Sequence, residues 1–275
     1  MLPYIPIYGE FKIPTYSLIF IVAFMVCALL SMKIAPSHNI DKFDAIASAM
    51  YALIGIAIGA KLMFFVSKIP GIVRHRDVAL DVIMDDPIGF LSWAFGGLVF
   101  YGGLIGAIVG GYRYCWRYRV SFNKLIDLYT PFFPIIHGFG RVGCFLAGCC
   151  YGIEYHGPFA VHFPYNEMSP DINLFPRFPV QLLEAGLNFI VGIILFIIAK
   201  KCKNIKPGQL LGIYLLYYLV ARFFLEMLRG DSVRGNVAGI STSQIISIII
   251  IPFAIFLIRG GLLKIKGRAF PDNVA

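Results

Sequence analysis

Residues 209–228 read QLLGIYLLYYLVARFFLEML, an apolar run that is interrupted only near its end by Arg222 and Glu226. A helix of about 20 apolar residues crosses roughly 30 Å of bilayer hydrocarbon. Further segments of similar character occupy approximately 15–32, 45–67, 88–111, 128–150, 179–199 and 243–263. The sequence therefore predicts an all-α integral membrane protein with about seven transmembrane helices.

The composition supports this assignment. Hydrophobic residues make up 59% of the chain, charged residues 14%, and the mean hydropathy is +0.78. A soluble domain of this length needs roughly a quarter of its residues charged. The net charge of +9 does not indicate nucleic-acid binding, because the cations fall in short loops between apolar runs. Charge instead reports the topology of a protein that lies in lipid.

The distribution of loop charges predicts an orientation. Lysine and arginine are concentrated in the loops around 33–42, 113–124 and 200–206 and in the C-terminal tail. Because basic loops stay in the cytoplasm, we expect a cytoplasmic C-terminus and an external N-terminus. The first 14 residues lack a basic n-region, so we expect the first apolar run to stay as an anchor.

The segments between the apolar runs suggest one membrane domain over residues 1–275. Residues from about 151 to 178 are polar, rich in proline and aromatic residues, and too long for a tight connection. We expect them to form a small extracytoplasmic head. The fourth apolar segment, 128–150, opens at Pro131-Phe-Phe-Pro134 and is rich in glycine, which favours a broken or re-entrant segment.

Charged residues inside the predicted spans are the first functional candidates, since each needs a partner, a wet cavity or an escape to the interface. Arg222 and Glu226 have i,i+4 spacing and share one helix face. A structural ion pair between helices and a functional role are both consistent with this spacing. Lys61, Arg141 and Glu184 pose the same question.

A glycine-rich segment surrounds Arg141 and reads HGFGRVGCFLAGCCYG over residues 137–152. Glycines allow close backbone approach and expose N–H groups, and a forked guanidinium binds phosphate through two hydrogen bonds. The segment therefore fits an anionic lipid headgroup. Helix packing through glycine with an arginine reaching toward the interface is the alternative.

Two tyrosines and a cysteine cluster complete the candidates. Tyr16 begins the first apolar run and Tyr101 lies among glycines, so either could face a cavity or belong to an interfacial aromatic belt. The Cys144-x4-Cys149-Cys150 spacing fits none of the usual paired zinc motifs, so we expect no metal site. Buried thiols are favoured, followed by a reactive thiol or an external disulfide.

The order of several short motifs resembles the prolipoprotein diacylglyceryl transferase family. These motifs are Tyr16-Ser-Leu, Gly96-Gly97 before Tyr101-Gly-Gly-Leu-Ile-Gly106, Gly140-Arg141-Val-Gly143, Pro179-Val-Gln181-Leu-Leu-Glu184, Arg222-x3-Glu226-x2-Arg229 and Gln244. The resemblance implies a seven-helix bacterial plasma-membrane enzyme without a cofactor. It would transfer the diacylglyceryl group of phosphatidylglycerol to the lipobox cysteine of prolipoprotein signal peptides and release glycerol phosphate.

The resemblance also implies roles for individual residues. Arg141 would hold the lipid phosphate, while Arg222 and Glu226 would organise the reaction cavity. The remaining candidates are Tyr16, Tyr101 and His137 for catalysis and Gly140, Gly143, Gln181, Glu184, Arg229 and Gln244 for substrate binding.

Two motifs depart from the family pattern. Tyr101 stands where the family has a histidine, and His137 is a candidate to compensate. The family's Gly-Asn-Phe-x-Asn-Gly-Glu reads Gly143-Cys-Phe-Leu-Ala-Gly-Cys149 here.

Two other functions stay open on the sequence alone. One is a related phospholipid-dependent transferase with another acceptor, in which a cysteine of the cluster relays the lipid covalently. The other is a lipid-binding or transport protein whose intramembrane charges line a pathway.

Overall fold

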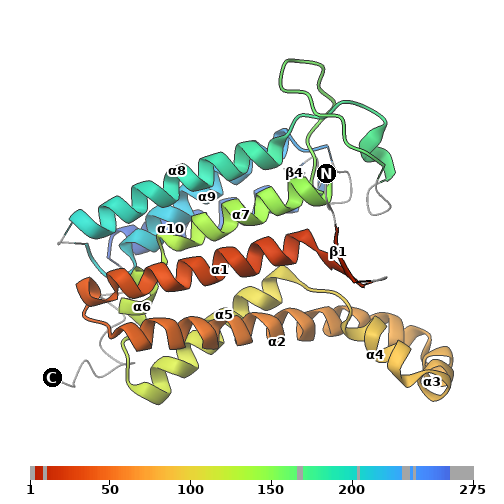
Figure 1. Ribbon diagram of the computed structural model, residues 1–275, viewed down its shortest axis with the longest axis horizontal. Coiled ribbons are helices and arrows are strands. Elements are labelled where there is room, and N and C mark those ends of the chain that lie inside the picture. Colours follow the sequence, from red (N-terminus) through yellow and green to blue (C-terminus); the bar gives the residue numbers. More distant parts are fainter. Residues whose placement is uncertain are drawn as a thin grey trace. The chain divides into compact units, whose positions relative to one another are not determined.

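The computed structural model describes residues 4–8, 11–165, 170–202, 205–230, 236–237 and 240–260 (Figure 1). The chain divides into two units. One consists of Asn39–Phe122, and the other combines Met1–His38 with Asn123–Ala275. We call the first the α2–α5 unit and the second the α7–α10 unit.

The α2–α5 unit is a helical hairpin with a bent return arm. It contains α2 (Lys42–Arg74), α3 (Arg76–Asp85), α4 (Pro87–Phe95) and α5 (Phe100–Tyr118). α2 and α5 pack through glycine: a Cβ on Gly106 would lie 1.9 Å from the Gly55 carbonyl oxygen, and one on Gly102 would lie 2.3 Å from that of Gly59. Such small-residue seams allow backbones to approach closely where lipid offers no hydrophobic driving force.

The predicted third segment, 88–111, is not one straight helix. α4 and α5 meet at 82° across a short break. Lys61 on α2 donates to the carbonyl oxygen of Phe95 at 2.9 Å, so the end of α4 supplies the partner that this lysine needs. The third segment is therefore broken, which its composition did not indicate.

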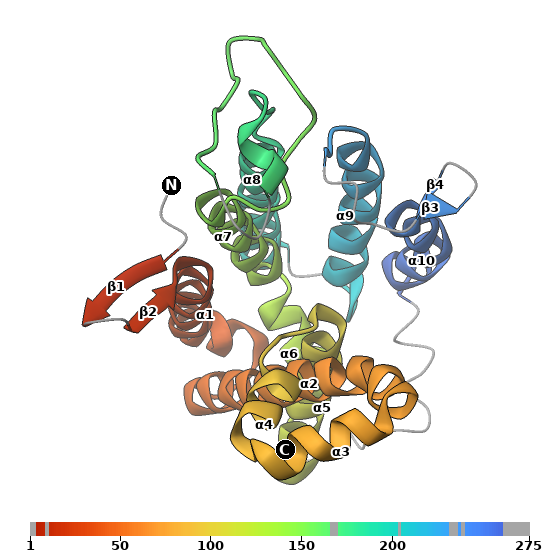
Figure 2. The same cartoon turned by 90° about the vertical axis from the view of Figure 1, so that its right-hand side faces the viewer.

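The α7–α10 unit is a row of packed helices preceded by a hairpin. β1 (Tyr4–Tyr8) pairs antiparallel with β2 (Phe11–Pro14), and α1 (Thr15–Ile34) continues into the short helix η1 (Ala35–His38). α6 (Phe122–Tyr129), α7 (Phe132–Ala147), α8 (Val180–Lys201), α9 (Gln209–Met227) and α10 (Thr242–Ile258) follow. α1 packs on α7, α7 on α8, α8 on α9 and α9 on α10 (Figure 2).

The described helices support membrane insertion but not the full count of seven spans. Four stretches are long and apolar enough to cross a bilayer, namely Thr15–His38, Lys42–Arg74, Val180–Lys201 and Gln209–Met227. The bent pair α4–α5 raises the number to 5 if it is one span. α7 and the apolar part of α10 are shorter, although α7 runs unbroken from Phe132 to Ala147.

The segment between α7 and α8 projects beyond the ends of these helices (Figure 1). It contains the short helix η2 (Pro170–Asn173) and a small apolar cluster of Tyr151, Phe163 and Ile172. A bridge joins Gly152 to Arg229, at the end of α9, where a two-residue hairpin of β3 (Asn236–Val237) and β4 (Ile240–Ser241) precedes α10. Residues 166–169 of the predicted head, and the C-terminal tail from 261, lie outside the described residues.

Candidate functional site

A buried polar stripe on α8 forms one wall of the site. Gln181, Glu184 and Asn188 follow i, i+3, i+7 spacing, so they share one helix face, and their exposed fractions are 0%, 2% and 1%. α8 packs on α7, where His137, Arg141 and Cys144 also share one face by i, i+4, i+7 spacing. Polar side chains this deeply buried need partners, and α7 provides those of Glu184.

Glu184 is the centre of the contacts between α7 and α8. Its Oε1 lies 3.0 Å from Nε of Arg141 and 3.4 Å from Nε2 of His137. The Tyr214 hydroxyl on α9 lies 3.5 Å from the other ring nitrogen, Nδ1, of His137. One carboxylate thus balances a buried guanidinium and orients an imidazole, and His137 links it to a buried phenol.

Arg141 is held but not fully enclosed. Its side chain is 12% exposed, and its ion pair uses Nε. Among the described residues, no carboxylate other than Glu184 forms an ion pair with it. A guanidinium has two further nitrogens with which it can bind an anion.

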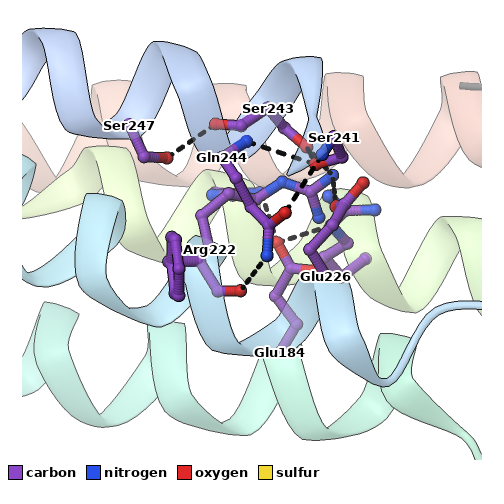
Figure 3. Close-up of polar contacts among 10 residues, drawn as sticks. Glu184, Arg222, Glu226, Ser241, Ser243, Gln244 and Ser247 are labelled. Atoms are coloured by element: carbon purple, nitrogen blue, oxygen red, sulfur yellow. Dashed lines mark hydrogen bonds and ion pairs between the residues drawn. The ribbon is translucent and has the colours of Figure 1, made fainter. Parts of the chain in front are cut away.

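A second arginine–carboxylate pair lies on α9 beside the start of α10 (Figure 3). Nη2 of Arg222 lies 2.5 Å from Oε2 of Glu226 and 3.4 Å from the Ser243 hydroxyl. Gln244 completes a capping box with Ser241 and donates to the carbonyl oxygen of Phe223 at 3.3 Å. The predicted pairing of Arg222 with Glu226 is present, and Gln244 fixes α10 against α9.

The polar groups of α8 and α9 form one electrostatic network. The positive charge of Arg222 attracts the carboxylate of Glu184, whose side chain points toward the α9–α10 pair in Figure 3. The buried polar atoms that make no hydrogen bond within the part of the chain that the structure describes include Nη1 of Arg222, Oε1 of Gln181 and Oδ1 of Asn188. A buried donor or acceptor without a partner costs folding free energy unless a ligand or a water molecule binds it. Such unpaired polar atoms are typical of a binding site.

The glycines near Arg141 mainly allow helix packing. A Cβ on Gly143 would lie 2.9 Å from the ring of Tyr16, and one on Gly138 would meet the Phe189 ring at 2.7 Å. Gly140 lies beside the Tyr16 hydroxyl. Tyr16 is 40% exposed at the start of α1. The packing alternative therefore accounts for these glycines, while Arg141 itself is ion-paired inside the helix row rather than directed to the interface.

Tyr101 belongs to the other unit. It is 56% exposed at the start of α5, and the glycines that follow it pack against α2. Its catalytic role stays a prediction.

The cysteine cluster lies at the end of α7. The Sγ atoms of Cys144, Cys149 and Cys150 all lie within 4.8 Å of one another, and all three are thiols. Gln181 donates to the Cys149 carbonyl oxygen at 2.9 Å. Arg229 lies within hydrogen-bonding reach of the Cys150 thiol. The spacing argument did not anticipate this convergence.

Sequence reasoning missed Asn188, Tyr214 and Ser243. Asn188 lies four residues after Glu184 in an apolar run, and its Nδ2 donates to the Glu184 carbonyl oxygen at 2.8 Å. That polar repeat was the available signal. Tyr214 and Ser243 carry no such signal, because their roles depend on which helices adjoin.

Apolar helices that enclose arginine–carboxylate pairs define a membrane protein with a built polar site. The chain belongs to the prolipoprotein diacylglyceryl transferase family, whose description matches residues 3–259. It is 31% identical over 247 residues to the phosphatidylglycerol--prolipoprotein diacylglyceryl transferase of Clostridium tetani, covering 90% of this chain and 92% of the relative.

Two further relatives carry the same description. The second such transferase of Clostridium perfringens is 31% identical over 94% of this chain and 96% of its own. The transferase of Rickettsia canadensis is 30% identical over 93% and 95%. Similarity therefore extends over nearly the whole length of both partners.

Proposed function

We propose that this protein transfers the diacylglyceryl group of phosphatidylglycerol to the lipobox cysteine thiol of prolipoproteins. The names of its relatives support the two substrates. The observation that carries the proposal is the buried Arg141–Glu184 pair, in which the guanidinium is fixed through Nε and its side chain stays 12% exposed.

The donor lipid would bind through its phosphate. Arg141 donates to the phosphodiester oxygens through its forked end, and Arg222 adds a second positive charge with its buried Nη1. Positive charge at this point stabilises the phosphate as it leaves, because the leaving group gains charge in a water-poor site. The amide oxygens of Gln181 and Asn188, which make no hydrogen bond to the described residues, would accept from glycerol hydroxyls.

The acceptor thiol must become a thiolate before it attacks. We assign the base to His137, because Glu184 lies 3.4 Å from its Nε2 and orients the ring. Because Nε2 of His137 faces Glu184, the ring would take up the thiol proton at Nδ1, beside the Tyr214 hydroxyl. Glu226 keeps Arg222 in place, and Tyr16 packs on Gly140 and Gly143 of α7.

In this reading the protein crosses a bacterial cell membrane seven times. The N-terminus and the 151–178 head lie outside, where prolipoproteins emerge, and the C-terminus lies in the cytoplasm. The loop charges support this orientation.

Mass spectrometry of the purified protein in phosphatidylglycerol vesicles with a lipobox peptide tests the proposal. We expect the peptide to gain one diacylglyceryl group and free glycerol phosphate to appear in equal amount. A lipobox peptide with serine in place of cysteine is the matched control and should stay unmodified. Absence of both products from the reaction of the folded wild-type protein contradicts the proposal.

A further inference from the structure

Three thiols converge at the C-terminal end of α7, beside the start of α8. Cys144 lies in the last turn of α7, and Cys149 and Cys150 follow the helix end. Their Sγ atoms lie within 4.8 Å of one another. Cysteines that serve only as small apolar residues need no such gathering, and Cys27 and Cys115 of this chain are buried singly.

The backbone is shaped to bring these thiols together. Gly148 ends α7 with a φ of 68°, and Cys150 has a φ of 58°, a left-handed conformation that is costly for a residue with a Cβ. The Cys149 N–H donates to the Cys144 carbonyl oxygen at 3.1 Å. Gln181 holds the same turn from α8 through the Cys149 carbonyl oxygen. The turn is thus fixed from both sides.

Two arginine side chains act on the cluster electrostatically. Arg229 lies within hydrogen-bonding reach of the Cys150 thiol, and the positive charge of Arg141 acts on Cys144. Two guanidinium groups can therefore offset the negative charge that three thiolates would carry. Negatively charged, soft sulfur ligands are suited to zinc or another thiophilic ion.

The spacing of the sulfur atoms also suits one ion. A zinc–sulfur distance of about 2.3 Å places neighbouring sulfurs of a tetrahedral site about 3.8 Å apart. Sulfur atoms that already lie within 4.8 Å need only small side-chain rotations to reach it. Three protein ligands leave the fourth position open, as in catalytic rather than structural zinc sites.

We propose that Cys144, Cys149 and Cys150 bind a zinc ion whose fourth position takes the acceptor cysteine of the prolipoprotein. This rests on the proposed function. Tyr101 stands where the family has a histidine, and a phenol is a poor base at neutral pH. A zinc ion would replace that base, because a thiol that coordinates zinc is deprotonated at neutral pH.

The chemistry balances without any further reactant. The acceptor S–H gives its proton to water as its sulfur coordinates the zinc, and water passes the proton to His137, about 10 Å away along α7. The thiolate forms an S–C bond to the terminal glyceryl carbon of the donor. The bond from that carbon to the phosphate oxygen breaks, and the electron pair leaves with glycerol phosphate beside Arg141. No electron is gained or lost overall.

Cobalt binding tests the site independently of transfer. Reduced, chelator-treated protein is titrated with Co²⁺ alone, and thiolate-to-cobalt charge-transfer absorption is recorded. We expect saturation at one equivalent, loss of the band in Cys149→Ser and Cys150→Ser, and no change in Cys202→Ser, which alters an exposed thiol. A lipobox peptide should raise the band by about one third, as three thiolates become four; its serine analogue should not.

The outcomes are separable. Absence of stoichiometric binding to the wild-type protein overturns the site, and binding without a response to the cysteine peptide overturns the acceptor role. Either result, obtained with protein that still transfers lipid, leaves the proposed function standing. A cobalt band that responds to peptide in protein that never transfers lipid supports the site and contradicts the proposed function.

Discussion

Nε of Arg141 on α7 lies 3.0 Å from Oε1 of Glu184 on α8, and both side chains are largely buried. The same oxygen lies 3.4 Å from Nε2 of His137. A guanidinium and an imidazole that share one carboxylate are each oriented by it, and either loses its orientation when the carboxylate is removed.

Removing the charge of Glu184 should therefore destabilise the α7–α8 contact. In Glu184→Gln, Arg141 stays buried without a carboxylate, and we expect a loss of about 3 kcal/mol in the free energy of unfolding. Thermal unfolding in detergent measures this. The control is Glu154→Gln, whose pair with His156 is exposed and should cost less than about 1 kcal/mol. Equal effects of the two variants would show that the buried pair is not structural.

His137 should affect turnover rather than donor binding. In His137→Gln we expect kcat for transfer to fall by about 10²- to 10⁴-fold, with KM for phosphatidylglycerol little changed, since a general base contributes in that range. Steady-state kinetics in vesicles separates the two parameters. His162→Gln, which alters an exposed histidine, should behave like the wild type. A raised KM with unchanged kcat in His137→Gln would assign the residue to binding instead.

The glycine seam of the α2–α5 unit should not tolerate a methyl group. In Gly106→Ala the added Cβ would lie 1.9 Å from the Gly55 carbonyl oxygen, so α2 and α5 must separate. We expect a melting temperature several degrees lower, from a cost of about 1–3 kcal/mol. Gly186→Ala is the matched control, because nothing lies within 4 Å of its new Cβ. Similar melting temperatures for both variants would contradict the seam.

Asp127 should make stability depend on pH. Burial raises the pKa of this carboxyl from 3.8 to about 6, although the Gly208 N–H donates to it at 2.8 Å. Between these values the native state binds more protons than the unfolded state, so stability falls as pH rises. We expect Asp127→Asn to flatten the melting temperature between pH of about 4 and 6, and Asp85→Asn, at an exposed acid, to leave the slope intact. A wild-type slope in Asp127→Asn would refute the assignment.

Composition and local spacing predict some features of this protein well. The apolar runs at 15–32, 179–199 and 209–228 correspond to α1, α8 and α9, because hydropathy reports burial in lipid directly. The Arg222–Glu226 pair follows from i,i+4 spacing within one helix. These features depend only on residues that are near one another in the chain.

Features that depend on residues far apart in the chain could not be predicted from local spacing. The bend between α4 and α5 depends on contacts with α2, including the bond from Lys61 to Phe95. The thiol cluster depends on the positive φ at Cys150, which no spacing rule predicts. The pairing of Arg141 with Glu184 needs α7 beside α8. The sequence shows that such charges require partners, and only the fold identifies them.

The forked end of Arg141 as the phosphate contact is the central claim, and an Arg141→Ala variant assayed for transfer of radiolabelled glycerolipid to a lipobox peptide tests it most directly. We expect transfer to be abolished, while Arg117→Ala, at an exposed arginine, transfers at the wild-type rate. A folded Arg141→Ala protein, shown by an unchanged elution profile, that transfers lipid as fast as the wild type would contradict the account.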